Sequence, residues 1–504
     1  MRRTLGEFPL LIQLSLAVCV AMLAPAFHGV WLGDWHVARS FGFYALLSSV
    51  LAAAIGLATV HNPHSGNAVG QLRTLFAAYL LLPAIMALPV AQVLPAYAME
   101  QIYFEMLSSL TTTGATVFDT PTDIPDPIHL WRAICAWLGG FMILVTAVAI
   151  LEPMQLGGFE IEAAIAPGGR PQRRSMGGGA AMRERLIRNA RIIAPPYLLL
   201  TAALVLGLLV AGDRLLVALC HAMSVLSTSG ITPLAAFGDA GSGHVGEALI
   251  FVFLFAAISR HPIGVVRFGS LRPRRGINPE YKIVLVCVLG LSGLLFARHF
   301  LGAVEVQDQE NVIGARAAAW GSLFNSLSFL STTGFSSRDW AAARDWSGLG
   351  TPGIIFLALC FLGGGIATTT GGIKLLRAYA LYKHGVREMQ RLVHPNSVGG
   401  AGITARRIRK EGAQIAWVFL MLFLVSLSAT IVALTLFGRS FEDALALATA
   451  ALTNTGPAAE LLDGQVRYSA LAAGERLVLG AAMLVGRLEV LVLVSVIHLN
   501  PLRR

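Results

Sequence analysis

Charged residues are scarce in this sequence. They account for 13% of its 504 residues, whereas hydrophobic residues account for 55%. Because a soluble domain usually carries about 25% charged residues, this shortage excludes a soluble globular protein. Apolar runs near the roughly 20 residues needed to cross a bilayer recur from end to end. The chain is therefore predicted to be an all-α polytopic membrane protein, since it also lacks the alternating strand pattern of a membrane barrel.

Paired cysteines and catalytic motifs are also missing. The five cysteines lie in apolar stretches without metal-ligand spacing, so we expect them to pack in the core and to form no disulfide. The sequence has no HExxH motif, no GxSxG motif and no facing pair of aspartates in its apolar runs. An intramembrane enzyme is therefore only a distant alternative. No Gly-Lys-Ser or Gly-Lys-Thr occurs either, which excludes a P-loop.

Ten segments are predicted to span the membrane. They cover about residues 9–32, 41–60, 71–96, 128–151, 192–211, 246–268, 281–301, 349–382, 412–437 and 471–498. Four further apolar runs are too short to cross and are predicted to be re-entrant half-helices, at about 98–111, 214–227, 315–331 and 441–453. Each short run ends in small polar residues followed by a glycine, and we call each such ending an elbow.

The order of these segments predicts an internal repeat. An N-terminal transmembrane hairpin (1–66) is followed by four units of span, half-helix, elbow and span, which cover 67–160, 185–275, 278–392 and 405–504. Because the four units share one orientation, they are predicted to surround a single pore with fourfold pseudosymmetry.

Basic and acidic loops alternate along the chain. Arginine and lysine gather at 170–191, 267–282 and 383–410, which predicts that these loops and both termini are cytoplasmic. The elbows fall on the opposite, acidic side. The net charge of +10 is therefore attributed to cytoplasmic loops, with no nucleic-acid partner. The segments 170–191 and 383–410 are candidate docking surfaces for a cytosolic partner or for the anionic headgroups of membrane lipids.

The four elbows are the strongest candidate site. They are Thr112-Thr113-Gly114, Thr228-Ser229-Gly230, Thr332-Thr333-Gly334 and Asn454-Thr455-Gly456. Non-helical backbone at membrane depth is tolerated only inside protein or around water. A ring of its carbonyls can replace the hydration shell of an alkali cation, and glycine admits the positive φ that turns successive carbonyls toward one axis. The partly negative C-terminal end of each half-helix also favours a cation.

One elbow taken alone is more often a helix C-cap with a left-handed glycine. Four elbows, each placed after a half-helix and before a full span, favour a shared ion path instead. Within the half-helices, Glu105 and Asn325 are expected to brace the elbows by hydrogen bonds, and His221 is expected to be a packing residue.

A glycine-rich segment, GGGIATTTGGIK, interrupts the eighth predicted span at 363–374. Glycine costs about 1 kcal/mol relative to alanine in a helix, so an unwound and mobile stretch is predicted, with close packing of small residues as the alternative. Its candidate gate residues are Gly363, Gly364, Gly365, Thr368, Thr369, Thr370, Gly371, Gly372 and Lys374. Lys374 is expected to snorkel inward or to help to gate.

Arg487 and Glu489 lie inside the tenth predicted span, where a charge is a functional hypothesis by default. Two residues apart on a helix point in different directions, so the two side chains are not expected to pair with each other. Pairing of Arg487 with Glu152 or another buried acid is the structural alternative.

The elbows, the ten-span order, the glycine-rich segment and Arg487 resemble the Trk/Ktr/HKT superfamily of potassium transporters. The bacterial Trk-type membrane subunit is the best match, because the N-terminal hairpin is present. The resemblance implies that carbonyls around the four elbow glycines form a filter for K⁺, the transported ion. Glycine at all four positions implies potassium rather than sodium, although Ser229 departs slightly from the glycine or threonine of many relatives.

The resemblance also implies how the pore is controlled. The segment 363–374 would obstruct the pore below the filter, and Arg487 would be an electrostatic barrier to cations. A cytosolic ring of nucleotide-binding regulatory subunits (TrkA-like, of the Rossmann or RCK type) and a second copy of the chain are the implied partners.

The predicted function is therefore passive, gated potassium uptake across the bacterial inner membrane. The membrane potential contributes about 2.3 kcal/mol per charge per 100 mV. A symporter that couples K⁺ to H⁺ or Na⁺ is the alternative within the same fold.

Overall fold

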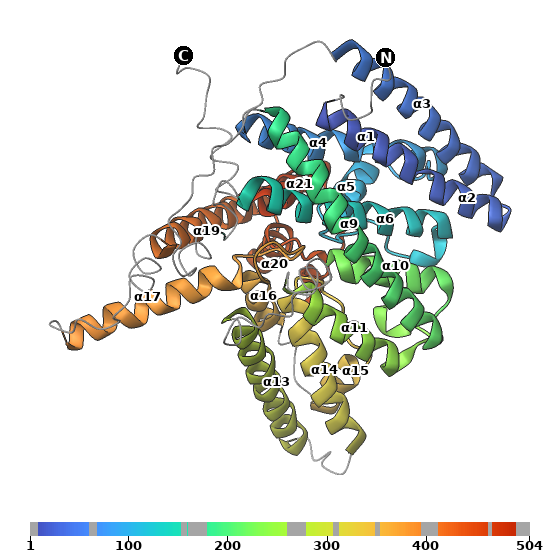
Figure 1. The fold of residues 1–504 in the computed structure, drawn as a ribbon. Helices are drawn as coiled ribbons and strands as arrows, with labels where there is room; N and C mark the ends of the chain where they lie inside the picture. Colours follow the sequence, from blue (N-terminus) through green and yellow to red (C-terminus); the bar gives the residue numbers. More distant parts are fainter. Residues whose placement is uncertain are drawn as a thin grey trace.

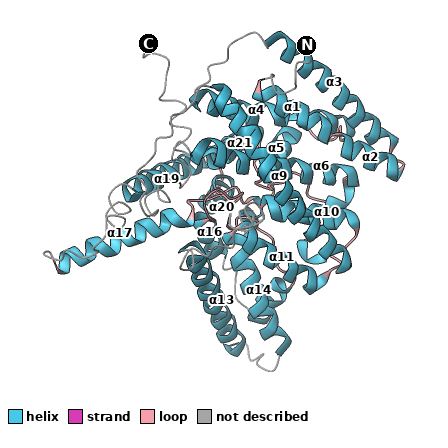
Figure 2. Cartoon of the chain, viewed as in Figure 1, coloured by secondary structure: helices cyan, strands magenta, loops and turns pink. Residues whose placement is uncertain are grey.

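The computed structural model describes residues 9–59, 68–152, 159, 179–259, 279–305, 312–347, 353–394, 412–461 and 466–489. Every regular element within these ranges is a helix (Figure 2). Seven helical stretches among them are long and apolar enough to cross a membrane. The prediction of an all-α, multi-pass membrane protein is confirmed for the described part of the chain.

The N-terminal hairpin lies at one edge of the molecule (Figure 1). Helices α1 (Leu10–Ala21) and α2 (Leu23–Leu32) occupy the first predicted span, and α3 (Trp35–Thr59) packs against both of them. Helix α2 ends at Gly33, whose φ of 77° is left-handed and reverses the chain toward α3.

The remaining helices follow a recurring order of a long helix, a short helix and a further helix. The long helices are α4 (Ala68–Val93), α9 (Gly179–Val210), α13 (Pro279–Glu305) and α19 (Ala413–Leu436). The short helices are α5 (Met99–Leu110), α10 (Leu215–Ser227), α14 (Val312–Leu330) and α20 (Phe441–Leu452). The helices after the elbows are α6 (Asp126–Thr146), α11 (Gly243–Ala257), α16 (Gly353–Leu362) with α17 (Leu375–Val393), and α21 (Ala473–Leu488).

Shorter elements join these helices. A π-helical turn, η3 (Ala147–Leu151), continues α6, and α15 (Asp339–Ser347) follows the third elbow. The 3₁₀ turns are η2 (Pro121–Asp123), η4 (Phe237–Asp239), η6 (Gly456–Leu461) and η7 (Tyr468–Ala470).

Several predicted boundaries are wrong. Helix α9 begins at Gly179, so the part of the basic segment 170–191 from Gly179 onward is helical rather than a loop. The part of 383–410 up to Val393 likewise belongs to α17, which extends away from the body of the molecule (Figure 1). Arginine, alanine, leucine and glutamate are strong helix formers, and both stretches are rich in them. The remainder of each basic segment, and 260–278, lie outside the described residues.

Three predicted spans are interrupted or reach past the described residues. The span at 349–382 is divided into α16 and α17, because residues 363–374 form no helix, as the glycine-rich segment predicted. Helix α11 ends at Ala257 and α21 at Leu488, and the chain beyond Ser259 and beyond Glu489 lies outside the described residues.

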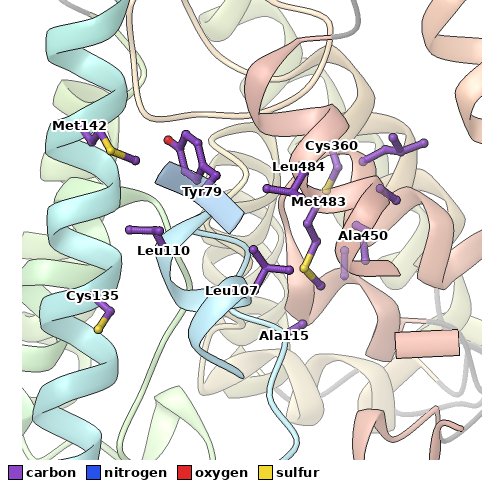
Figure 3. Close-up of a cluster of buried hydrophobic side chains, with 14 of the residues drawn as sticks. Tyr79, Leu107, Leu110, Ala115, Cys135, Met142, Cys360, Ala450, Met483 and Leu484 are labelled. Atoms are coloured by element: carbon purple, nitrogen blue, oxygen red, sulfur yellow. The ribbon is translucent and has the colours of Figure 1, made fainter. Parts of the chain in front are cut away.

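One large apolar cluster connects these helices. Figure 3 shows part of it, where Tyr79 of α4, Leu107 of α5, Met142 of α6 and Met483 of α21 gather around one region. Four of the five cysteines (Cys19, Cys135, Cys220 and Cys360) are buried, as expected of packing residues. This core holds the short helices from the outside and so fixes where their C-terminal ends meet.

Candidate functional site

All four elbows begin with the same turn. The residue two positions before each glycine has a positive φ: 54° at Thr112, 53° at Thr228, 57° at Thr332 and 52° at Asn454. The N–H of the following residue donates to a carbonyl five residues back, from Thr113 to Ser108 (2.8 Å), Ser229 to Ser224 (2.9 Å), Thr333 to Ser328 (3.0 Å) and Thr455 to Ala450 (2.8 Å). This is the Schellman pattern of a helix C-cap. Every elbow therefore contains a helix C-cap, which forms the part of the elbow that precedes the glycine.

The left-handed residue of this turn was not anticipated. A positive φ is a genuine outlier for a β-branched residue such as threonine. Such strain costs on the order of 1–3 kcal/mol and persists only where the surroundings impose it. The sequence signal for it is weak, because only Asn454 is of a type that visits this region readily.

The hydroxyl groups of the elbows bond to one another. The pairs are Thr111 with Thr113 (2.8 Å), Ser227 with Ser229 (3.2 Å), Ser331 with Thr333 (2.9 Å) and Thr453 with Thr455 (3.2 Å). The first hydroxyl of each pair also donates to a carbonyl of the preceding helical turn. The hydroxyls therefore stabilise the turn of the backbone.

The four elbows form a closed ring. A Cβ atom added to an elbow glycine would meet the next elbow in the chain: the Ser229 carbonyl oxygen from Gly114, the Thr333 carbonyl oxygen from Gly230, Pro457 from Gly334 and the Ala115 nitrogen from Gly456. The last of these contacts returns to the first elbow. The helices agree, because α6 packs on α10, α11 on α14, α16 on α20, and α21 on α5.

The fourth elbow joins the first by hydrogen bonds. The Gly456 N–H donates to the Thr113 carbonyl oxygen at 2.5 Å, and the Asn454 amide donates to Thr113 Oγ1 and to the Met483 carbonyl oxygen, both at 3.0 Å. Gly114, Gly230 and Gly334 have positive φ values of 74°, 68° and 82°, but Gly456 does not. The expectation of a left-handed glycine is wrong there, because Gly456 begins the 3₁₀ turn η6.

In the first and third short helices, the side chain nine residues before the elbow glycine accepts a hydrogen bond from the chain that follows the elbow. Glu105 accepts a hydrogen bond from the Val117 N–H at 2.8 Å, and Asn325 accepts one from the Ser337 N–H, also at 2.8 Å. The bracing predicted for Glu105 and Asn325 is confirmed. Glu105 is itself paired with Arg132 at 2.6 Å.

His221 occupies the same position before Gly230. It is fully buried, packs edgewise against Phe335, and its Nε2 lies 3.0 Å from Thr232 Oγ1. It is a packing residue, as predicted, but it is only half satisfied, because its buried Nδ1 has no hydrogen-bond partner among the described residues. Leu447 holds this position before Gly456, where Tyr468 instead donates to the Gly456 carbonyl oxygen at 2.9 Å.

The glycine-rich segment 363–374 is a buried loop against the ring. The Gly371 N–H donates to Thr332 Oγ1 at 2.8 Å, and the Thr228 hydroxyl donates to Thr369 Oγ1 at 3.2 Å. A Cβ atom on Gly371 would overlap the Thr453 carbonyl oxygen. These contacts fall on elbow residues that precede the glycines, so the loop lies at the end of the ring where the short helices stop.

Within the loop, the remaining threonines and glycines hold one another. Thr368 donates to the Gly365 carbonyl oxygen at 2.7 Å and lies 2.6 Å from the Thr370 hydroxyl. The Gly364 carbonyl accepts from the Leu375 N–H at 3.0 Å. Gly363 and Gly372 have φ values of 64° and 75°, which let the two ends of the loop approach each other.

Arg487 and Lys374 point into this loop. Arg487 is 4% exposed and donates to the Thr369 carbonyl oxygen at 2.5 Å, and Lys374 donates to the Thr370 carbonyl oxygen at 2.5 Å. Within the described part of the chain Arg487 forms no ion pair, so the pairing with Glu152 is not found there. A cavity beside the two cations is lined by the loop, by the π turn η3 and by the end of α21.

Glu489 lies outside helix α21, with a φ of 58°, and so not on a helical turn with Arg487. It pairs with Arg377 at 2.9 Å, and the Arg377 guanidinium lies 3.9 Å from the ring centroid of Phe419. Arg377 was not singled out from the sequence, because it directly follows the glycine-rich segment and there resembles one of many basic residues. Only the folded chain places this buried pair beneath the loop.

A transition-metal site is not part of this arrangement. No group of three or more histidine, cysteine, aspartate or glutamate side chains in the described residues could hold a metal ion. The atoms that the ring offers as ligands are backbone and hydroxyl oxygens. Such oxygens suit a hard cation whose hydration shell they can replace.

Comparisons with known proteins agree with the fold. The family model TrkH, "Cation transport protein", matches residues 85–236 and 280–500. The "Trk system potassium uptake protein TrkH" of Halomonas elongata is 30% identical over 397 residues, which are 78% of this chain and 77% of that protein. The protein of the same name from Escherichia coli K12 is 28% identical over 412 residues, or 79% and 78% of the two chains.

A solved structure is also similar. It is the "Crystal Structure of the Potassium Transporter TrkH from Vibrio parahaemolyticus", with a TM-score of 0.77 at 24% identity over 99% of both chains. The fold and the ring of elbows define a multi-pass membrane transport protein. The chain belongs to the TrkH family of cation transport proteins, which confirms the resemblance drawn from its sequence.

Proposed function

We propose that this chain takes up potassium through the centre of the ring of four elbows. The observation that carries the proposal is the closure of the ring, in which each elbow glycine abuts the next elbow. Backbone carbonyls of the elbow residues replace the hydration shell of K⁺, apart from those, such as the carbonyls of Thr113 and Gly456, that accept hydrogen bonds from the protein. The C-terminal ends of α5, α10, α14 and α20 add partial negative charge around the same point. Relatives named for potassium uptake support the choice of ion.

The proposal includes the finer architecture predicted above. Ten transmembrane helices comprise the N-terminal hairpin (1–66) and four pore units at 67–160, 185–275, 278–392 and 405–504, related by fourfold pseudosymmetry. The chain lies in the bacterial inner membrane with both termini in the cytoplasm. The positive-inside distribution of arginine and lysine supports this orientation.

The buried loop 363–374 and Arg487 form the gate. The loop contacts three of the four elbows, and Arg487 bonds to its backbone at Thr369. A cation leaving the ring toward the loop meets the positive charges of Arg487 and Lys374, and both are buried. Opening requires either that the loop and Arg487 move together or that the hydrogen bond between them breaks.

Control comes from a cytosolic nucleotide-binding regulatory subunit (TrkA-like) that docks on the basic cytoplasmic segments. The relatives are named as parts of a Trk system, which supports a multi-component assembly. A homodimer of the chain and contacts with anionic lipids complete the proposed assembly.

A symporter that couples K⁺ to H⁺ or Na⁺ is the second candidate. Buried carboxylates such as Glu105 and Glu489 are the groups that a proton could use, but both are engaged by arginines. Reversal of K⁺ flux at the K⁺ equilibrium potential, independent of imposed H⁺ and Na⁺ gradients, is expected of the channel-like path. A reversal that shifts with either gradient would establish the symporter.

The purified chain in proteoliposomes tests the filter. Uptake driven by a membrane potential is compared for potassium, rubidium, sodium and lithium. We expect potassium and rubidium to enter and sodium and lithium to be excluded. Equal uptake of all four ions would contradict the proposal that the ring is a potassium filter.

A further inference from the structure

Glu247 is a buried carboxylate that the pore mechanism does not use. It lies in the first half of α11 and is 3% exposed. It accepts hydrogen bonds from Trp320 Nε1 (2.7 Å), from the Ser337 hydroxyl (3.0 Å) and from the Arg338 N–H (2.7 Å). No cationic side chain of the described residues lies within ion-pair distance of it. Three donors, rather than an opposite charge, therefore offset the cost of burying this charge.

The donors belong to the neighbouring elbow. Helix α11 follows the second elbow, whereas Ser337 and Arg338 are the third and fourth residues after Gly334 in the third elbow. Trp320 is on α14, the short helix of that same third elbow. Glu247 thus connects one quarter of the ring to the next one.

The segment after Gly334 is held from two sides. From inside, Asn325 accepts the Ser337 N–H at 2.8 Å, and from the neighbouring unit Glu247 accepts the Ser337 hydroxyl and the Arg338 N–H. A further contact lies beside these hydrogen bonds: His244, one turn before Glu247, lies 2.8 Å from Asp339. The chain that leaves the third elbow is therefore fixed to a rigid helix over three consecutive residues.

We propose that Glu247 is a positioning residue for the third elbow and contributes to the choice between potassium and sodium. The inference rests on the proposed function, since it assumes that the ring selects the ion. A ring discriminates against a smaller cation only if its carbonyls cannot close around that cation without cost. Holding the chain directly after Gly334 resists that closure. Loss of the Glu247 bonds leaves the third elbow free to contract around sodium.

The test compares ion selection in four variants reconstituted in proteoliposomes. Glu247→Ala removes all three bonds and is expected to lower the potassium-to-sodium flux ratio about tenfold, in line with the loss of hydrogen bonds to a charged group. Glu247→Gln keeps one acceptor and the side-chain volume, and about a threefold decrease is expected. Ser337→Ala removes one donor in the chain that leaves the third elbow, and about a twofold decrease is expected. Trp137→Phe is the matched control, because it removes an indole donor like that of Trp320, but one that bonds to Thr201 and not to Glu247, and it leaves the ratio nearly unchanged.

The variants are measured only as monodisperse protein after size exclusion, and the maximal potassium flux is recorded beside the ratio. A structural defect lowers the flux of both ions together, whereas the proposal requires sodium flux to rise relative to potassium flux. If Glu247→Ala does not fold, Glu247→Gln and Ser337→Ala decide the matter. An unchanged ratio in those two variants, with a selective parent protein, overturns the role of Glu247 alone. A parent protein without preference for potassium overturns the proposed function as well.

Discussion

The third and fourth elbows are neighbours in the ring, yet their glycines meet different needs. Gly334 has a φ of 82°, and an added Cβ would lie 3.1 Å from the side chain of Pro457. Gly456 has no positive φ, but an added Cβ would overlap the backbone of Ala115 and Gly114. Backbone conformation thus requires glycine in the third elbow, and close approach of two backbones requires it in the fourth.

The residues beside the glycines differ as well. Thr332 accepts a hydrogen bond from the buried loop 363–374, at the Gly371 N–H. Asn454, at the same position of the fourth elbow, donates to Thr113 and Met483 and so ties its elbow to the first one. One sequence pattern therefore serves two structural tasks. The residue two positions before the glycine hydrogen-bonds to the loop 363–374 in the third elbow and to the first elbow in the fourth.

The largest effect is expected for Gly456→Ala. The new methyl group would occupy the place of backbone atoms that cannot move without opening the ring, and such overpacking costs about 1–3 kcal/mol or more. The midpoint temperature of thermal unfolding in detergent and the rate of rubidium uptake should both fall strongly. Gly42→Ala in α3, where an added Cβ meets nothing within 4 Å, is the control. Normal uptake by the Gly456 variant would contradict the backbone contact between the fourth and first elbows.

A smaller but more specific effect is expected for Gly334→Ser. A side chain at positive φ costs about 1 kcal/mol, and the neighbour Pro457 can yield slightly, so the protein should still fold and conduct. We expect potassium selection over sodium to weaken, measured as flux ratios in liposomes. Gly33→Ser carries the same backbone strain at a φ of 77° outside the ring and should leave the ratio unchanged. Unchanged ratios for Gly334→Ser would sink the filter assignment.

Replacement of Asn454 by threonine gives the fourth elbow the same sequence as the third, Thr-Thr-Gly. The left-handed turn should survive, because threonine adopts it in the other three elbows. The bonds to Thr113 Oγ1 and the Met483 carbonyl oxygen are lost, which should cost about 1–2 kcal/mol of stability with a modest change in flux. Chemical unfolding curves measure the loss. A stability equal to that of the parent would mean that Asn454 does not hold the ring closed.

Arg487→Ala should affect the elbows least, because Arg487 bonds to the loop beneath them and not to the ring itself. We expect conductance to rise by several-fold, since a buried positive charge is removed from the cation path, while the potassium-to-sodium ratio stays constant. Initial rates of potassium and sodium uptake into proteoliposomes measure both the conductance and the potassium-to-sodium ratio. Arg391→Ala, an exposed arginine on α17, is the control. Flux that is unchanged or reduced would refute the barrier role.

Much of the helical order could be predicted from apolar runs. The C-terminal ends of α5, α10, α14 and α20 lie within one residue of their predicted positions, because a helix stops where hydroxyl residues and glycine begin. The bracing by Glu105 and Asn325 was also predicted, since a polar side chain in a buried half-helix needs a partner. Helix α15 was missed because it is only nine residues long and contains three charged residues, so it does not read as an apolar run.

The contacts between distant segments could not be predicted. Nothing in the local sequence indicates that Glu489 pairs with Arg377, or that Gly456 meets Ala115, because each contact joins residues more than 100 positions apart. The left-handed threonines were missed for a related reason. Local preference opposes that conformation, and only the surrounding packing imposes it.

The sequence alone determined that the chain is a helical membrane protein with four glycine-ended half-helices, because composition, apolar length and local capping act over a few residues at a time. The tertiary structure decided that these four ends close into one ring, that two glycines serve different purposes, and that Glu247 reaches the neighbouring elbow. Those features depend on which backbones approach each other, and close approach is a property of the packed chain rather than of any segment within it.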